Sequence, residues 1–423
     1  MQQIKTDTKK KKSKALLLIF LCWIVYMVSY FGKVNYSANI TQIVDFYGVT
    51  KAQAGIAPTF FFFAYGVGQF INGAFSRKYK IKWMVFFSLV ASAIINFTIA
   101  VGNTFWIIKW LWLANGLVMS VLWPMLIRFL AENLPSKALR MSSVVMGTTV
   151  AGGTLIIYAL SSLYAMFGKF KYSFYTASFC VFAVAILWLL LYKKASVDAK
   201  TERDAEEVVV VSANENTEQK RVQSVSERKI FISVIVVLCF FAIGVNLTKD
   251  GLTTWVPSIL KEEFSMSDSL SILLTLFLPI LAIFGNAFAI KVHDKIPDYI
   301  NHCTVIFIAC ACFIGVIITS LAFKLEAPML VCLIAVNFLA SSLNSLITGI
   351  FPLFMRDKVD SGTVAGVLNG FSYLGSTISS YGLGVIADNF GWTYVFVALI
   401  GFCILAFVAW IAYSLYKQKQ QTT

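Results

Sequence analysis

Two lysines of this sequence stand inside long apolar stretches. Lys33 lies in VYMVSYFGKVNYSANI, residues 25–40, and Lys249 lies in FFAIGVNLTKDGLTTWVPSIL, residues 240–260. A charged side chain inside a membrane span costs about 2.5–3.5 kcal/mol on insertion scales, and such residues face a bundle interior or a water-filled cavity. Two lysines at matching places in two halves of a chain therefore predict a central binding site for an anion.

Polar side chains accompany Lys33 at helical spacing. Tyr26, Tyr30 and Ser37 stand 7 and 3 residues before it and 4 residues after it, so a helix would place them all on one face. Tyrosine hydroxyls beside an ammonium group can donate to phosphoryl or carboxyl oxygens. The alternative is structural: Lys33 would reach the membrane interface or pair with a helix carboxylate, although it lies far from the nearest loop.

Lys249 is followed directly by a carboxylate, Asp250. Three roles are open for Asp250: a local counterion, a proton carrier of the kind used by symporters, or a structural partner for the amino-terminal half. Gly251 and Pro257 follow within the same segment. They predict an interrupted helix that exposes backbone groups to a cavity.

Five more residues are candidates for lining the same site. Gln69 and Asn246 carry amides that need partners in an apolar surrounding. Tyr65 stands one helical turn before Gln69, in an aromatic run where side-chain packing is the competing explanation. Thr149 and Tyr373 are candidates because they stand in matching segments of the two halves.

The composition is that of a membrane protein with many spans. Of the 423 residues, 58% are hydrophobic and 13% are charged, and the mean hydropathy is +0.77. Soluble domains are about 45–50% apolar and about 25% charged. A net charge of +14 would suggest nucleic acid in a soluble chain. Here most lysines and arginines fall in short loops between apolar runs, so we expect no nucleic-acid partner.

A helical span needs about 20 mainly apolar residues, and twelve segments qualify. They form two sets of six: 15–40, 52–76, 83–102, 105–130, 139–166 and 172–193, then 229–260, 268–292, 301–323, 327–354, 361–387 and 392–416. We therefore expect an all-α membrane protein with twelve transmembrane helices in two six-helix pseudo-symmetric halves. Pro124 predicts a kink in the fourth span.

These spans divide the chain into five parts. A basic segment, 1–14, precedes the first bundle, 15–193, and a tail, 417–423, follows the second bundle, 229–416. The linker between them, 194–228, is polar with few aromatic residues, so we expect it to be flexible.

The distribution of lysine and arginine predicts the orientation. Twenty-seven of them fall in the amino terminus, the even-numbered loops, the linker and the tail, and six fall in the odd-numbered loops. By the positive-inside rule both termini and the linker are cytoplasmic. We expect a multi-pass protein of a bacterial inner membrane, in contact with the lipid bilayer and monomeric.

The residues expected of an enzyme, a metal site or an ATP site are missing from the sequence. The eight cysteines stand in apolar segments without metal-ligand spacing. His293 and His302 both fall near one predicted loop. No Gly-Lys-Ser/Thr phosphate loop occurs, and no Ser–His–Asp set stands out. We expect no cofactor, no metal and no catalytic residue.

Small residues recur at matching places in the two halves. MGTTVAGG, residues 146–153, opens the fifth span, and NGFSYLG, residues 369–375, occupies the same place in the eleventh. Small residues let helices approach closely, and repeated halves are typical of transporters with a site near the membrane midplane.

The chain resembles the major facilitator superfamily and, within it, the organophosphate:phosphate antiporters. The resemblance covers nearly the whole chain except the linker. It is carried by Tyr-x-x-x-Tyr-x-x-Lys-x-Asn from Tyr26 to Asn35, by KDGLTTWVP at 249–257, by GVLNGFSYLG at 366–375 and by Phe390-Gly391-Trp392.

The resemblance implies a transporter, with Lys33 and Lys249 standing where that family has two phosphate-binding arginines. Lysine is a compact point charge rather than the planar fork of arginine. Gln69 stands where some members have a further lysine, and Thr149 where some have a histidine. In the loop after the second span, GAFSRK at 73–78 has arginine in place of the usual aspartate.

We therefore expect a secondary transporter that exchanges a phosphate ester for inorganic phosphate by alternating access. One alternative is proton-coupled symport of a sugar acid or another carboxylate, with Asp250 as the proton carrier. A second alternative is a transporter-like membrane receptor for a phosphate ester. All three bind a small anionic solute.

Overall fold

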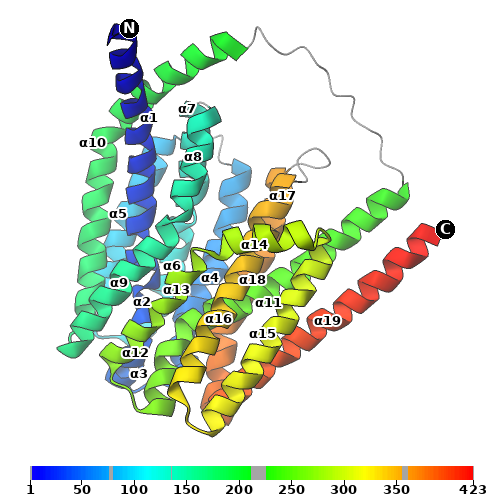
Figure 1. Cartoon of the computed structure of the whole chain (residues 1–423). Helices are drawn as coiled ribbons and strands as arrows, with labels where there is room; N and C mark the ends of the chain where they lie inside the picture. The colour runs from blue at the N-terminus through cyan, green and yellow to red at the C-terminus, as the bar shows by residue number, and fades with distance from the viewer. Residues whose placement is uncertain (1, 76–79, 135, 211–224, 355–360, 423) are drawn as a thin grey trace.

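The computed structural model describes residues 2–75, 80–134, 136–210, 225–354 and 361–422. Within these ranges every regular element is a helix. Figure 1 shows a helical bundle in which the chain ends of α1 and α19 both lie away from α3 and α12.

The amino-terminal half contains ten helical segments. They are α1 (Gln2–Ser29), α2 (Phe31–Ala38), α3 (Ile40–Tyr47), α4 (Lys51–Phe75), α5 (Ile81–Val101), α6 (Phe105–Met119), α7 (Leu122–Asn133), α8 (Ser136–Gly147), α9 (Thr149–Met166) and α10 (Lys171–Val210).

The carboxy-terminal half contains nine α-helices and one π-helical turn. They are α11 (Val225–Phe264), α12 (Asp268–Thr275), α13 (Phe277–Ala282), α14 (Gly285–Lys295), α15 (Tyr299–Ala322), α16 (Glu326–Ser345), the π-helical turn Leu346–Ile350, α17 (Phe351–Phe354), α18 (Ser361–Phe390) and α19 (Trp392–Thr422).

The twelve predicted spans correspond to helical segments of this structure. Ten described helical stretches are long and apolar enough to cross a membrane. The eighth predicted span is a pair of segments, Asp268–Ala282 and Ala287–Lys295, that meet at 48°. The eleventh is α18, which is rich in glycine and serine. The all-helical fold class is thus confirmed.

The predicted interruption of the seventh span is wrong. Helix α11 continues through Gly251 and Pro257 without a break. A proline inside a helix removes the hydrogen bond to the carbonyl four residues earlier, which here belongs to Thr253. That oxygen accepts instead from the hydroxyl of Tyr158, at 3.1 Å. The replacement partner explains why the helix can continue.

Helix α4 uses the same arrangement. Pro58 stands inside α4 and leaves the carbonyl of Ala54 without its helical partner. The hydroxyl of Tyr36 donates to that oxygen at 2.9 Å. Tyr36 and Ala54 both belong to the amino-terminal half, whereas Tyr158 and Thr253 lie on opposite sides of the boundary between the halves.

The first span, expected as one helix, is divided at Tyr30 and Asn39. Within α2 the backbone amide of Tyr36 donates to the side-chain oxygen of Asn35, at 3.1 Å. The carbonyl of Gly32 accepts from the side-chain amide of Asn115, at 2.7 Å. Side-chain amides therefore satisfy the backbone beside Lys33, as buried irregular backbone requires.

Two other expectations about helices have clear outcomes. The fourth span is interrupted at Ser120 and Val121, between α6 and α7, and Ser120 is the residue whose carbonyl Pro124 leaves unpaired. The linker is more helical than expected, because α10 continues to Val210 and α11 begins at Val225. Residues 76–79 of the GAFSRK loop lie outside the described ranges.

The small-residue segments pack in the same way in both halves. A Cβ atom added to Gly153 of α9 would overlap the carbonyl oxygen of Met27. A Cβ atom added to Gly375 of α18 would overlap the carbonyl oxygen of Ile243. Met27 and Ile243 each stand six residues before a lysine, Lys33 and Lys249 respectively. The repeat inferred from the sequence therefore corresponds to matching close contacts between helices.

The two halves meet mainly along two pairs of helices. Helix α4 packs against α18, and α9 packs against α12. The α4–α18 contact is close because glycines lie in it: a Cβ atom on Gly55 would overlap the carbonyl of Ser380, and one on Gly66 would lie 3.0 Å from Cβ of Tyr373. This packing encloses a cavity between the halves.

Candidate functional site

A cavity of about 330 Å³ lies between the two halves and receives side chains from both. The amino-terminal half contributes Lys33 and Ser37 with an aromatic group, and the carboxy-terminal half contributes Lys249, Asp250 and several amides. Both lysines singled out by the sequence line this one cavity. Its size suits a small organic solute, since ligand pockets are about 300–1,000 Å³.

Lys33 is held by aromatic rings rather than by a carboxylate. Its side chain is 7% exposed. Its Nζ atom lies 4.5 Å from the ring centroid of Tyr26, 4.7 Å from that of Tyr30 and 5.2 Å from that of Tyr65. Among the described residues Nζ has no hydrogen-bond partner. The rings attract the cation, while its three N–H donors stay available to a ligand.

Lys249 has a different environment. Its Nζ atom lies 3.3 Å from Oδ1 of Asp250. The hydroxyl of Ser376, from α18, donates to the other carboxylate oxygen. Ser376 also accepts from the side-chain amide of Asn246, at 3.4 Å. Asp250 is therefore in contact with Lys249 as the counterion role requires, and α18 fixes its position.

Two tyrosines face each other across the boundary between the halves. The ring centroids of Tyr65 and Tyr373 are 5.0 Å apart, and both residues line the cavity. The ring of Tyr65 also lies 5.2 Å from Nζ of Lys33. Tyr65 therefore connects the aromatic rings around Lys33 to the carboxy-terminal half.

Seven of the ten predicted site residues line the cavity: Lys33, Lys249, Tyr30, Tyr65, Asn246, Tyr373 and Asp250. The ring of Tyr26 lies 4.5 Å from Nζ of Lys33, and Gln69 stands one turn after Tyr65 in α4. Thr149 is fully buried, and its hydroxyl donates to the carbonyl of Met146 in the preceding turn. These three residues lie outside the described cavity lining.

Other lining residues were not among those predicted. Trp112 contributes an indole from the fourth span, and Asn337, Asn344 and Asn369 contribute amides from the tenth and eleventh. A buried amide in an apolar segment is the signal that singled out Asn246. The same criterion applied to Asn337 and Asn344 would have found them, whereas a tryptophan gives no comparable signal.

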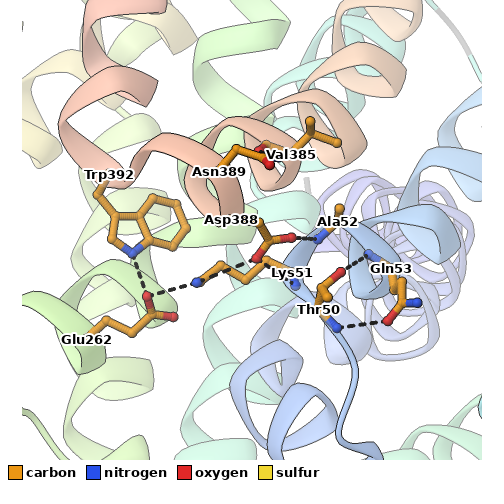
Figure 2. A network of polar contacts seen from close by, with 9 residues as sticks. All are labelled: Thr50, Lys51, Ala52, Gln53, Glu262, Val385, Asp388, Asn389 and Trp392. Atoms are coloured by element: carbon orange, nitrogen blue, oxygen red, sulfur yellow. Dashed lines mark hydrogen bonds and ion pairs between the residues drawn. The ribbon is translucent and has the colours of Figure 1, made fainter.

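At the end away from the termini, a network of polar contacts joins the halves (Figure 2). Nζ of Lys51 lies 3.2 Å from Oε2 of Glu262 and 3.6 Å from Oδ1 of Asp388. The indole of Trp392 donates to Glu262 at 2.9 Å. Asp388 also accepts from the backbone amides of Lys51 and Ala52, at 3.1 and 2.6 Å. The start of α4 is thereby attached to α11 and α18.

Further contacts join the halves at the same end. Lys261 of α11 pairs with Asp45 of the amino-terminal half and, at 2.8 Å, with Asp268. The hydroxyl of Ser162 in α9 donates to the carbonyl of Ser269 in α12, at 2.8 Å. Together with the bond from Tyr158 to Thr253, these contacts hold the halves together on the side of the cavity that faces away from the termini.

Comparison with known proteins identifies the family. The model of the Major Facilitator Superfamily matches residues 22–380, which is most of the 423-residue chain. The chain belongs to this superfamily. A major facilitator protein is a membrane transporter rather than an enzyme, in agreement with a solute-sized cavity between two helical halves.

Curated relatives of this major facilitator protein fit the resemblance to organophosphate:phosphate antiporters. "Sugar phosphate exchanger 3" of Mus musculus is 22% identical over 84% of this chain and 78% of its own length. The "Probable hexose phosphate transport protein" of Chlamydia pneumoniae is 19% identical over 95% and 92%. The "Membrane sensor protein UhpC" of Escherichia coli (strain K12) is 24% identical over 23% of each chain.

Solved structures of transporters share the fold. The bacterial homolog of the human lysosomal transporter Spinster, in an inward-facing and occupied conformation, has a TM-score of 0.73 at 12% identity, covering 95% of this chain and 97% of its own. The D-xylose-proton symporter has a TM-score of 0.69 at 14% identity, covering 95% and 97%. The major facilitator fold is confirmed by these similarities.

Proposed function

We propose that this protein is a secondary transporter that exchanges a phosphate ester for inorganic phosphate. The observation that carries the proposal is that Lys33 and Lys249, one from each half, line a single solute-sized cavity. Ammonium groups bind phosphate oxygens through charge-assisted hydrogen bonds. The names of the full-length relatives, which refer to sugar phosphate exchange and hexose phosphate transport, support an anionic solute of this class.

The arrangement of charges supports exchange. A cavity with two ammonium groups and one carboxylate keeps an excess of positive charge when it is empty, and moving such a site through an apolar barrier is costly. A bound anion removes the excess. Reorientation of the filled site is then favoured over that of the empty site, which couples the exit of one anion to the entry of another.

The same proposal includes the side of the membrane to which the cavity opens. By the positive-inside rule, the end with both termini faces the cytoplasm of a bacterial cell. The contacts of Lys51, Lys261 and Tyr158 then lie on the opposite side. We propose that these contacts close the outer side in an inward-facing state, that they separate when the site faces outward, and that the protein works as a monomer.

Counterflow in proteoliposomes tests the proposal. Vesicles loaded with inorganic phosphate should take up a labelled hexose 6-phosphate, whereas vesicles without internal anion should show little uptake. Full-rate uptake into anion-free vesicles would contradict exchange. Binding without any uptake, in either vesicle type, would favour a sensor like the relative that matches part of the chain.

Proton-coupled symport is the second candidate, because a carboxylate lines the cavity beside Lys249. In that mechanism Asp250 takes up a proton on one side and releases it on the other. A pH gradient should then drive accumulation of a sugar acid in the wild-type protein, and Asp250→Asn should abolish it. Accumulation that persists in Asp250→Asn would remove this candidate.

A further inference from the structure

Three charged residues line the cavity among the described parts of the chain: Lys33, Lys249 and Asp250. With the ordinary charges of these side chains, the lining has one positive charge in excess. The carboxylate is not free to turn away, because Lys249 contacts one oxygen and Ser376 donates to the other. Asp250 is 17% exposed at the side chain and Lys249 is 25% exposed, so both are accessible from the cavity.

The two lysines are unequal as partners for an anion. Lys33 has three rings around it, and its buried Nζ atom has no hydrogen-bond partner among the described residues, so its donors are not already bound to another group. Lys249 already has an anionic partner within contact distance. A doubly charged ligand beside Lys249 would also lie close to the carboxylate of Asp250, and like charges at such range repel.

From this geometry we infer that Asp250 determines the charge of the accepted substrate and sets the site to prefer singly charged over doubly charged oxyanions. The inference rests on the proposed function, which supplies the oxyanion. Phosphate esters and inorganic phosphate satisfy it in their singly charged forms, and for a phosphate monoester this form is accessible because the second pKa is about 6. Sulfate monoesters and carboxylates of the same size would be accepted as well.

Two ligands of matching shape test the inference. A hexose 6-phosphate carries close to two negative charges at about pH 8, and a hexose 6-sulfate carries one. Their affinities are measured by competition against a labelled hexose phosphate bound to the purified full-length protein. In the wild-type protein we expect the sulfate ester to bind at least as tightly as the phosphate ester.

Asp250→Asn removes the negative charge and keeps the shape. We expect the ratio of affinities, phosphate over sulfate, to rise by about tenfold, as a change of about 1.4 kcal/mol in charge interaction would give. Asp294→Asn is the matched control, because Asp294 is exposed at the end of α14, and its ratio should equal that of the wild-type protein. If Asp250→Asn does not fold, Asp250→Ser provides the same charge change.

The outcomes distinguish a failure of the proposed function from a failure of the inference about Asp250. If neither ester binds the wild-type protein, the proposed function is wrong. If both bind but the ratio in Asp250→Asn stays within about twofold of the wild-type ratio, the inference about Asp250 is wrong and the proposed function stands. A wild-type preference for the phosphate ester of about tenfold or more would also overturn the inference.

Discussion

The hydroxyl of Tyr158 lies 3.1 Å from the carbonyl oxygen of Thr253, across the boundary between the two halves. Pro257 makes this oxygen available, because a proline cannot donate to the carbonyl four residues before it. The same proline that would disturb α11 thus creates an acceptor for the other half. This bond can exist only in conformations in which α9 and α11 are close.

Tyr158→Phe should favour separation of the halves at the end away from the termini. Removing the donor leaves a partly buried carbonyl without its partner, at a cost of up to about 1–3 kcal/mol, which is relieved when the halves part and water enters. The measurement is labelling of a cysteine introduced at Thr154, a cavity residue, in a background without native cysteines. A membrane-impermeant thiol reagent is added on the side of the membrane opposite to the termini.

Tyr36→Phe is the matched control for this variant. Tyr36 donates to a carbonyl made available by Pro58, but within one half. Tyr36→Phe should lower the thermal unfolding temperature without changing the rate at which the cysteine introduced at Thr154 is labelled. Equal labelling in both variants would show that the bond from Tyr158 does not hold the halves together.

Lys33→Gln and Lys249→Gln should each weaken binding of a phosphate ester by about 10- to 100-fold, because hydrogen bonds to charged groups contribute about 1.5–3 kcal/mol. Ligand-induced thermal stabilisation of the purified protein measures the effect. Lys295→Gln, at an exposed position at the end of α14, should retain full stabilisation. Undiminished stabilisation in either cavity variant would place the anion elsewhere.

Tyr65→Leu should weaken phosphate-ester binding by about two- to thirtyfold, because a cation–π contact is worth about 0.5–2 kcal/mol and its loss leaves Lys33 less well positioned. Tyr65→Phe keeps the ring, whose centroid lies 5.2 Å from Nζ of Lys33, and removes only the hydroxyl. Comparing the two variants by the same thermal measurement separates the ring from the hydroxyl. If the two variants bind equally, the ring does not position Lys33.

Gly153→Ala and Gly375→Ala should each lower stability by about 1–3 kcal/mol, the range found for overpacked positions. In both, the new Cβ atom overlaps a backbone carbonyl of a neighbouring helix. The control is Gly315→Ala in α15, where nothing lies within 4 Å of the added atom. Thermal unfolding in detergent should show a loss for the first two and no loss for the third.

The fold and the position of two lysines in the cavity between the halves could be predicted from the sequence, because each follows from a strong rule about membrane spans. A charged residue inside a membrane span is costly and therefore faces a bundle interior or a water-filled cavity. This rule identified Lys33 and Lys249 without any structural information. The number and grouping of the spans follow from their length and hydropathy.

The contacts between individual helices were harder to predict. Pro257 was expected to interrupt a helix, but a hydroxyl from a distant helix satisfies the carbonyl it leaves unpaired. Thr149 was expected in the cavity, yet its hydroxyl donates to the carbonyl of Met146 in the preceding helix, α8. Asn337 and Asn344 were missed. In each case the outcome depends on which face a neighbouring helix presents, and a single sequence does not contain that relationship.

The backbone amides at the start of α4 are bound by a residue of the other half, and this affects how the halves separate. Thr50 accepts from the amide of Gln53 within the same segment, but the amides of Lys51 and Ala52 bond to Asp388 of α18. The first turn of this helix is therefore completed by a residue of the opposite half. When the halves part, water must solvate two amides that protein had satisfied. The rate of the transport cycle should consequently respond to the activity of water on this side of the membrane, and osmolytes that lower this activity should favour the form in which the halves are joined there.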